Sequence, residues 1–239
     1  MDPPRLERVR LLLIRHGQTP GNVLGQLDTA HPGPGLTALG IEQAAALADS
    51  LDGEPIDALY ASTLVRTQFT AEPLSRMRGL DVEVRPGLHE IEAGSLELRS
   101  DRDSIRRYLE TVYAWGVGDL GVPMPGGPDG HAFFGRFDDD VATIAASGAE
   151  VAAVVSHGAA IRVWVSSRAR NIASSFGAEN PLDNTGVVVL DGSPAEGWTL
   201  TAWAGTPIGG PALIDEDAGD PTGETLEEAI DSAPDLPSE

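Results

Sequence analysis

Cysteine is absent from the 239-residue sequence, and all 16 of its basic residues are arginine. Without cysteine the chain has no disulfide framework, no thiol nucleophile and no thiolate metal site. Acidic residues number 37 against those 16, which gives a formal net charge of −21. Because nucleic acids and anionic membranes are bound through basic surfaces, we expect neither as a partner. An anionic ligand must therefore be held by a few arginine and histidine side chains brought together locally.

Long apolar runs are missing as well. The longest one near the start, Leu11 to Ile14, is too short for a signal sequence or a membrane span, so we expect a cytoplasmic protein. Aromatic residues make up only 5% of the chain, and Phe133 and Phe137 share a helical face that we expect to be buried. With 41% hydrophobic residues the chain can still bury one full core.

Short apolar runs alternate along the chain with segments of helical periodicity. The patterns predict strands at 9–14, 57–61, 82–84, 151–155, 187–190 and 198–203, and helices at 36–51, 62–77, 101–115, 130–146 and 159–170. Thr37 and Ser62 are the expected N-caps of the first two helices. This alternation favours an α/β fold, a three-layer α/β/α sandwich with a mostly parallel central sheet. The last two strands fit an antiparallel hairpin at the sheet edge.

Two of the predicted buried strands end in a histidine. The first runs into Arg15, His16 and a glycine, and the strand at 151–155 runs into a serine, His157 and Gly158. Because the carboxyl ends of parallel strands lie at one edge of a sheet, the two imidazoles are expected to face one pocket. Gly158 also opens a helix, whose N–H groups and dipole favour an anion.

Other polar residues are predicted to reach the same edge. Arg66 follows the strand at 57–61 and lies one turn into the next helix, while Glu90 lies in the loop after the third strand and Asn22 in the first loop. Guanidinium groups match phosphate oxygens, an imidazole can act as a nucleophile, and a carboxylic acid can protonate a leaving alcohol. The set suits a phosphoryl group.

With these motifs the sequence resembles the histidine phosphatase superfamily, also called the phosphoglycerate mutase-like family, and specifically its phosphatase branch. The matching stretches and the strands around them extend from residue 9 to about 205. They are RHGQTPGN (15–22), LTALGIEQA (36–44), YASTLVRTQFTA (60–71), LHEIEAGSLE (88–97) and VVSHGAAIR (154–162).

The resemblance implies a phosphomonoesterase that works through a phosphohistidine, without a metal or an organic cofactor, on a small phosphorylated substrate. His16 is the implied nucleophile, and Glu90 the acid for the leaving oxygen and then the base for water. Arg15, Arg66 and His157 are implied to clamp the phosphoryl oxygens. The resemblance also implies that Asn22 and Thr19 of the first loop, and Gly158 at the start of a helix, contact the substrate.

Electrostatics adds three expectations to those roles. The cations should keep His16 neutral, since like charge lowers an imidazole pKa. Glu90 needs a raised pKa to be protonated for the first step, and Glu92 and Glu97 are close enough in sequence to help. His157 is expected to be charged and to assist the arginines. Phosphoryl transfer depends mainly on this kind of positioning and charge stabilisation.

Several alternatives remain open at this stage. Glu92 can replace Glu90 as the acid, Thr19 can simply brace its loop, and one of the arginines at 99–107 can meet a second anionic group. The reaction can be that of a phosphoglycerate mutase, with transfer to a second alcohol instead of water. The chain can also be a non-catalytic phospholigand-binding protein. The sequence names neither the physiological substrate nor the oligomeric state.

The C-terminal part differs in composition from the rest. Residues 1–212 are predicted to form the catalytic domain, and 213–239 carry ten acidic residues and no basic ones. Few large apolar residues and a high charge predict a disordered acidic tail, with at most one helical turn at 226–230. We therefore expect removal of residues 215–239 to leave turnover unchanged.

Overall fold

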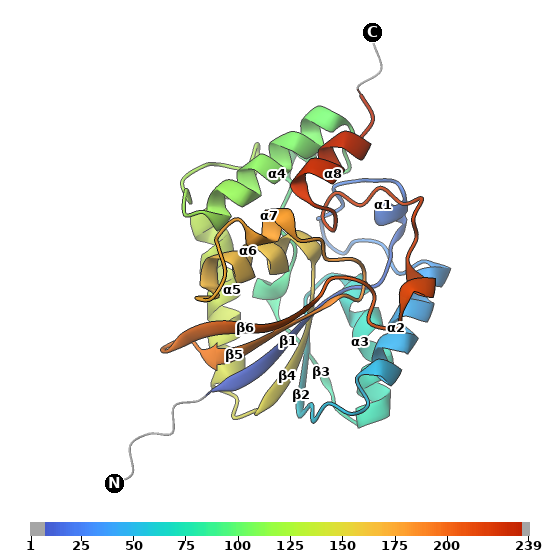
Figure 1. Ribbon diagram of the computed structural model, residues 1–239, viewed down its shortest axis with the longest axis vertical. Coiled ribbons are helices and arrows are strands. Elements are labelled where there is room, and N and C mark those ends of the chain that lie inside the picture. Colours follow the sequence, from blue (N-terminus) through green and yellow to red (C-terminus); the bar gives the residue numbers. More distant parts are fainter. Residues whose placement is uncertain (1–7, 236–239) are drawn as a thin grey trace.

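The computed structural model describes residues 8–235, which form a six-stranded sheet covered by helices on both faces (Figure 1). The strand order is β3-β2-β4-β1-β5-β6. Strands β1 to β4 run parallel, β5 is antiparallel to β1, and β6 is antiparallel to β5. The predicted α/β class and the edge hairpin are confirmed. The strands are β1 (Val9–Arg15), β2 (Ala58–Ala61), β3 (Val82–Val84), β4 (Val151–Ser156), β5 (Val187–Ser193) and β6 (Gly197–Ala204).

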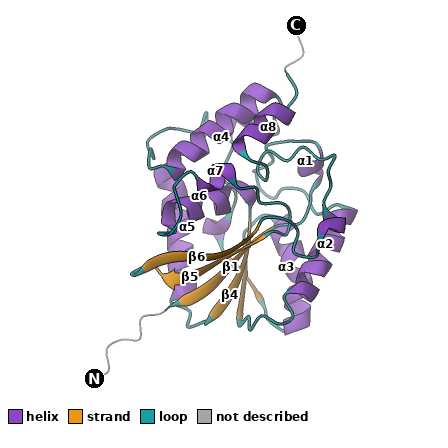
Figure 2. Ribbon diagram, in the orientation of Figure 1, coloured by secondary structure: helices purple, strands orange, loops and turns teal. Residues whose placement is uncertain are grey.

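The helices form two layers (Figure 2). Helices α2 and α3 lie on one face of the sheet, and α4 to α7 lie over the other. Among residues 8–235 no helix is long and apolar enough to cross a membrane. The helices are α1 (Pro20–Val23), α2 (Ala38–Ser50), α3 (Val65–Arg78), α4 (Arg102–Gly116), α5 (Gly130–Ala145), α6 (Gly158–Arg168), α7 (Phe176–Glu179) and α8 (Leu226–Ser232), with short 3-10 turns at Pro86–Leu88, Gly94–Leu96 and Pro211–Leu213.

Strand alternation divides the core between the two layers. On β1, Leu11 and Leu13 pack on the face that also buries the aromatic residues of α4 and α5. The intervening Leu12 and Ile14 pack on the opposite face, with residues of α2 and α3. Because neighbouring side chains of a strand point to opposite faces, a strand buried on both sides needs this continuous apolar run. The predicted core aromatics Phe133 and Phe137 are both fully buried.

The sheet register aligns the strand ends that carry the polar motifs. Arg15, the last residue of β1, lies opposite Ser156, the last residue of β4. Ala61, at the end of β2, lies opposite Val155. The segments that follow β1, β2 and β4 therefore leave the sheet side by side at one edge.

The start of α3 differs from the prediction. Its N-cap is Leu64, which makes no side-chain capping bond, so the helix begins at Val65 rather than at Ser62. The Ser62 hydroxyl still accepts a hydrogen bond from the Leu64 amide (3.2 Å) but turns toward the site. Because of the later start, Arg66 lies in the first turn of the helix rather than one turn deep.

The C-terminal segment also differs from the predicted disordered tail, because its described part, up to residue 235, is folded against the domain. Helix α8 lies beside α4 in Figure 1, and Ala229 and Ala233 are buried in the larger core. The Arg102 amide donates to the Pro234 carbonyl (2.7 Å), and the Arg102 guanidinium donates to the Ala233 carbonyl. Two alanines and one arginine thus hold the segment in place. A prediction of disorder from hydrophobicity and charge does not include such single contacts. Residues 236–239 lie outside the described part.

Candidate active site

His16 lies at the carboxyl end of β1 and exposes only 3% of its surface. Its Nδ1 lies 2.7 Å from the Gly17 carbonyl oxygen. A carbonyl only accepts hydrogen bonds, so Nδ1 carries the proton and Nε2 keeps its lone pair. Burial, helped by the guanidinium groups of Arg66 and Arg15, holds the pKa of His16 well below its usual value. The side chain is therefore a neutral imidazole with a free nucleophilic nitrogen.

His157 lies opposite His16, as the two strand ends predict. The ring centroids are 5.2 Å apart and the rings are inclined by 61°. The Ser62 hydroxyl lies 2.7 Å from His157 Nε2 and already accepts from the Leu64 amide, so we assign it as the donor to Nε2. This assignment leaves the ring proton on Nδ1. Burial, with Arg66 and His16 nearby, holds the pKa of His157 well below its usual value. The expectation of a charged His157 is therefore wrong for the ligand-free site, where the ring is a neutral donor.

Arg15, Arg66 and His157 carry buried nitrogen atoms that have no hydrogen-bond partner among the described residues. They are Arg15 Nε, Arg66 Nε, Arg66 Nη1 and His157 Nδ1. Arg66 Nη1 lies 3.8 Å from Asp28 Oδ1, too far for a hydrogen bond, and both arginines are close enough to His16 for their charge to lower its pKa. Elsewhere, Arg78 Nε and Arg162 Nη2 are also buried and unpaired. An unpaired buried donor costs about 1–3 kcal/mol, so a group of them in one place indicates a missing acceptor. The charges of the arginines indicate that the acceptor is an anion.

Glu90 lies on the same side of the sheet and is 2% exposed. Its carboxylate accepts hydrogen bonds from the Ile91 amide (2.8 Å) and, at the N-terminus of α6, from the Ala159 (3.2 Å) and Ala160 (2.9 Å) amides. Burial nevertheless raises its pKa, against the lowering effects of the Ile91 amide and of Arg66. The helix N-terminus predicted to favour an anion thus already holds a carboxylate of the chain itself.

Glu92 and Glu97, the other acids of this loop, have different surroundings. Glu92 is exposed and lies 3.3 Å from His89 Nε2. Glu97 accepts from the Thr29 and Ala30 amides, both at 2.9 Å, and so fixes the loop that follows Asn22. Among the three acids, Glu90 is the one whose carboxyl contacts the helix that His157 caps.

The first loop is held by its own residues. Thr19 and Asn22 form a capping box around α1, in which the Asn22 side-chain oxygen accepts from the Thr19 amide (2.9 Å). The Thr19 hydroxyl is used in the same box, so in the structure Thr19 braces the loop. Asn22 Nδ2 donates to Asp220 (3.1 Å). Gly158 is the first residue of α6, and a Cβ there would lie 3.0 Å from Arg15 Nε.

Sequence reasoning missed several residues that support the site. Asn184, in the loop before β5, donates to the His16 carbonyl (3.0 Å), and β5 enters the sheet at this edge because it is antiparallel. Arg136 of α5 donates to the main-chain carbonyls of His89 and Glu90, both at 2.7 Å, and fixes the loop of the acid. Asn184 could have been found from the turn residues that precede β5. The sequence around Arg136 gives no indication of its role.

The arginines at 99–107 do not contribute to the site in the structure. Arg99 pairs with Asp101 at 2.7 Å and Arg106 with Asp103 at 3.1 Å, while Arg102 contacts the C-terminal segment. Two of these pairs are local and the third is with Asp235, just after α8, and the arginine side chains are partly solvent-exposed. The structure therefore does not support a contact of these arginines with a second anionic group of the substrate.

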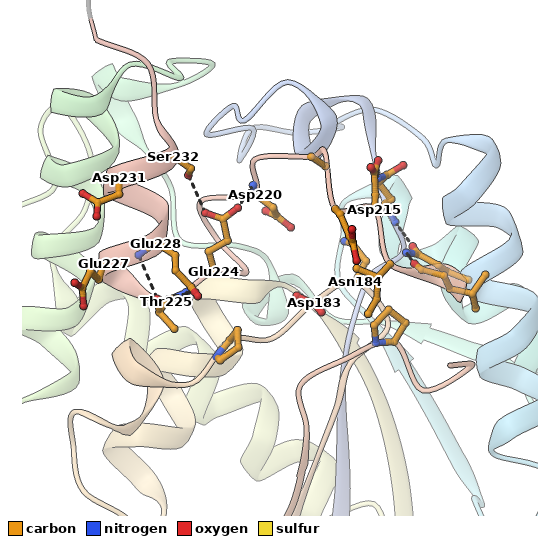
Figure 3. A pocket seen from close by; sticks show the side chains of 18 residues that line it. Asp183, Asn184, Asp215, Asp220, Glu224, Thr225, Glu227, Glu228, Asp231 and Ser232 are labelled. Atoms are coloured by element: carbon orange, nitrogen blue, oxygen red, sulfur yellow. Dashed lines mark hydrogen bonds between the residues drawn. The ribbon is translucent and has the colours of Figure 1, made fainter. Parts of the chain in front are cut away.

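A cavity of about 830 Å³ lies next to the site, on the side of the C-terminal segment (Figure 3). Asn184 and Asp220 form part of its wall, and acidic side chains of the C-terminal segment line much of the rest. His16 is not among the residues that line it.

Comparisons with known proteins agree with this geometry. The model of the histidine phosphatase superfamily (branch 1) matches residues 11–206. The chain is 40% identical over 216 residues, 84% of its length, to the PE-PGRS family protein PE_PGRS11 of Mycobacterium tuberculosis. The match takes in 37% of that protein. The present chain is also 41% identical over 107 residues, 45% of its length, to an adenosylcobalamin/alpha-ribazole phosphatase of Escherichia coli. That match takes in 52% of the relative.

The chain thus spans about two fifths to half the length of these curated relatives. Among solved structures it is similar to the alpha-ribazole phosphatase from Shigella flexneri. The TM-score is 0.66 at 30% identity, with 82% of this chain and 96% of the other covered. A family match over most of the chain, on a fold that agrees, gives a plain conclusion. The chain belongs to the histidine phosphatase superfamily, branch 1.

Proposed function

We propose that this protein hydrolyses phosphomonoesters through a phosphohistidine on His16, without a metal ion. The observation that carries the proposal is the group of unpaired buried donors from Arg15, Arg66 and His157 around a neutral His16. These donors suit the charge and the oxygen atoms of a phosphoryl group, whose transfer depends mainly on positioning and charge stabilisation. A pure binding site needs neither the free imidazole nitrogen nor the buried acid.

The first half of the proposed reaction transfers the phosphoryl group to the protein. The lone pair of His16 Nε2 attacks phosphorus, and the bond from phosphorus to the ester oxygen breaks. Glu90 gives its proton to the departing oxygen, which leaves as an alcohol. The raised pKa of Glu90 supports this role, because a larger fraction of the carboxyl is protonated in mildly acidic solution.

The second half returns the protein to its starting state. The Glu90 carboxylate takes a proton from water as the water oxygen attacks phosphorus. The bond between phosphorus and Nε2 breaks, and its electron pair returns to the imidazole. Arg15, Arg66 and His157 hold the phosphoryl oxygens in both halves. A phosphate dianion would raise the pKa of His157, so the ring is free to become charged once substrate binds.

More of the similar curated proteins are named phosphatases than mutases, which supports hydrolysis over transfer to a second alcohol, although one is named a probable phosphoglycerate mutase. Alpha-ribazole phosphatases are named among both the sequence and the structural relatives. We therefore propose alpha-ribazole phosphate as the first natural ester of a test panel. A phosphoglycerate mutase would instead show stimulation by a bisphosphoglycerate.

The test is hydrolysis of p-nitrophenyl phosphate in EDTA by the wild type, His16→Ala and Glu90→Gln. We expect metal-independent turnover in the wild type and none with His16→Ala. Glu90→Gln should lower kcat by about 10²- to 10⁴-fold on an alkyl phosphate and by less on p-nitrophenyl phosphate, whose leaving group needs little protonation. A His16→Ala variant as active as the wild type would overturn the proposal.

A further inference from the structure

The C-terminal segment reaches the guanidinium group of Arg15, which is fully buried. Arg15 Nη2 lies 2.5 Å from Asp220 Oδ2 and donates to the Thr222 hydroxyl (3.0 Å), and Nη1 donates to the Leu182 carbonyl (2.8 Å). Both terminal nitrogens are thus held from outside the site. The remaining nitrogen, Nε, has no hydrogen-bond partner among the described residues.

The same carboxylate holds a second residue of the proposed phosphoryl site. Asp220 Oδ1 accepts from Asn22 Nδ2 at 3.1 Å and lies 3.3 Å from the Thr222 hydroxyl. The Asp220 amide donates to Glu224 Oε1 (2.9 Å), which fixes the turn that presents the carboxylate (Figure 3). One side chain therefore ties together Arg15 of β1 and Asn22 of α1.

The segment that carries Asp220 is built into the domain. Arg162 Nη1 donates to the Thr222 carbonyl (3.1 Å), and the Leu182 amide donates to the Gly223 carbonyl (2.8 Å). A Cβ on Gly223 would overlap Arg15 Nη1, and one on Gly158 would overlap the Thr222 carbonyl. Such close backbone approaches need glycine at both positions. The contacts are those of a permanent part of the site rather than of a loosely docked tail.

Two roles are physically open to a carboxylate in this place. It can occupy the place of a phosphoryl group and compete with substrate, or it can fix the arginine while the phosphoryl group binds elsewhere. The second role fits better, because the unpaired donors of Arg15, Arg66 and His157 remain available beside it. The Leu182 and Thr222 contacts also hold the same end of Arg15, in the direction away from Nε.

We propose that Asp220 is a positioning residue of the reaction: it orients Arg15 and Asn22 and supplies the counter-charge of the buried guanidinium. This inference rests on the proposed function. A buried cation without a partner is costly, and Asp220 offsets that cost while leaving Nε free for the phosphoryl group. Because an orientation error of about 1 Å can cost roughly 10²-fold in rate, loss of Asp220 should act through Arg15.

The test compares Asp220→Asn and Asp220→Glu with Glu227→Gln. Glu227 lies on the same segment and lines the same cavity, so its variant removes one acidic charge without touching Arg15. We expect Asp220→Asn to lower kcat on p-nitrophenyl phosphate by about 10- to 100-fold with little change in KM. Asp220→Glu should recover part of the loss, and Glu227→Gln should match the wild type. Thr222→Val, which keeps every charge, should give a smaller drop.

The coupling to Arg15 separates positioning from a merely structural effect. In an Arg15→Gln background, Asp220→Asn should lower kcat by a much smaller factor than in the wild type, because only its contact with Asn22 is left to lose. The inhibition constant of orthovanadate should rise by the same factor as kcat falls.

If Asp220→Asn behaves like Glu227→Gln, the inference is overturned and the proposed function stands. If Asp220→Asn is more active than the wild type, Asp220 competes for the phosphoryl site, which also overturns it. A wild type that neither turns over substrate nor binds orthovanadate rejects the proposed function together with this inference.

Discussion

At the scale of single residues, burial decides the protonation states of the site. His16, His157 and Glu90 are each nearly or fully buried, and each pKa moves toward the neutral form mainly for that reason. The proposed chemistry needs this pattern, with a neutral nucleophile and a protonated acid present together. The acidic limb of the activity profile should follow His16 and the alkaline limb Glu90.

The buried histidines predict a loss of stability in acid. In the unfolded chain a histidine titrates near pH 6.5, whereas His16 and His157 stay neutral in the folded protein. As the pH falls below about 6.5 the unfolded state binds protons first, so the free energy of unfolding decreases by up to about 1.4 kcal/mol per pH unit for each histidine. Urea unfolding from pH 7.5 to 5 measures this slope. His16→Gln should flatten it, and an equal slope in both proteins would contradict the assignment of His16.

The residues that sequence reasoning found share a simple property. Arg15 ends β1, and His16 and His157 directly follow β1 and β4, so the strand assignment alone was enough to bring them to one end of the sheet. Arg136 and Asp220 were missed because their partners lie far along the chain: Arg136 contacts the loop at Glu90, and Asp220 pairs with Arg15 over 205 positions of separation, from 15 to 220. No local pattern encodes such contacts.

At the scale of elements, the N-terminus of α6 is where several parts of the site meet. His157 is its N-cap, Gly158 its first residue, and its early amides hold the Glu90 carboxylate. The C-terminal segment passes so close to Gly158 that a side chain has no room there. The sequence Ser156-His157-Gly158 therefore serves two needs: the imidazole of His157 faces the site, and Gly158 leaves room for the C-terminal segment.

Gly158→Ala should accordingly destabilise the protein. The new Cβ would overlap the Thr222 carbonyl and lie 3.0 Å from Arg15 Nε, and overpacking of this kind costs about 1–3 kcal/mol. Gly135→Ala in α5 is the matched control, because no atom lies within 4 Å of its Cβ. Replacing a helical glycine by alanine should there stabilise the fold by about 0.5–1 kcal/mol. Urea titrations of both variants give the comparison. Equal free energies of unfolding would mean that the C-terminal segment moves away from the new Cβ without loss of stability, which would contradict this prediction.

At the scale of the whole molecule, the acidic C-terminal segment is the main difference between sequence and structure. Composition marks residues 213–239 as disordered, yet Ala229 and Ala233 pack into the core beside α4. Asp220 also forms an ion pair with the buried Arg15. Average hydrophobicity and charge do not register these few specific contacts, since each depends on a partner elsewhere in the chain.

The two views predict opposite results for removal of residues 215–239. A disordered tail would leave turnover intact, whereas the structure predicts a lower thermal midpoint and a fall in kcat of about tenfold or more, because Arg15 loses Asp220 and Thr222. Differential scanning fluorimetry and p-nitrophenyl phosphate turnover on the truncated protein decide between them. Unchanged values for both would restore the disordered-tail interpretation.

The measurement that tests the central claim most directly is a rapid acid-free quench of the enzyme during turnover, followed by peptide mass spectrometry. The account predicts a phosphoryl group on His16 that is labile in acid, stable in base and absent from His16→Ala. It should accumulate in Glu90→Gln when p-nitrophenyl phosphate is the substrate, because the base for the attacking water is missing. Turnover by a wild type that carries no phosphoryl group on His16 at any time would contradict the account.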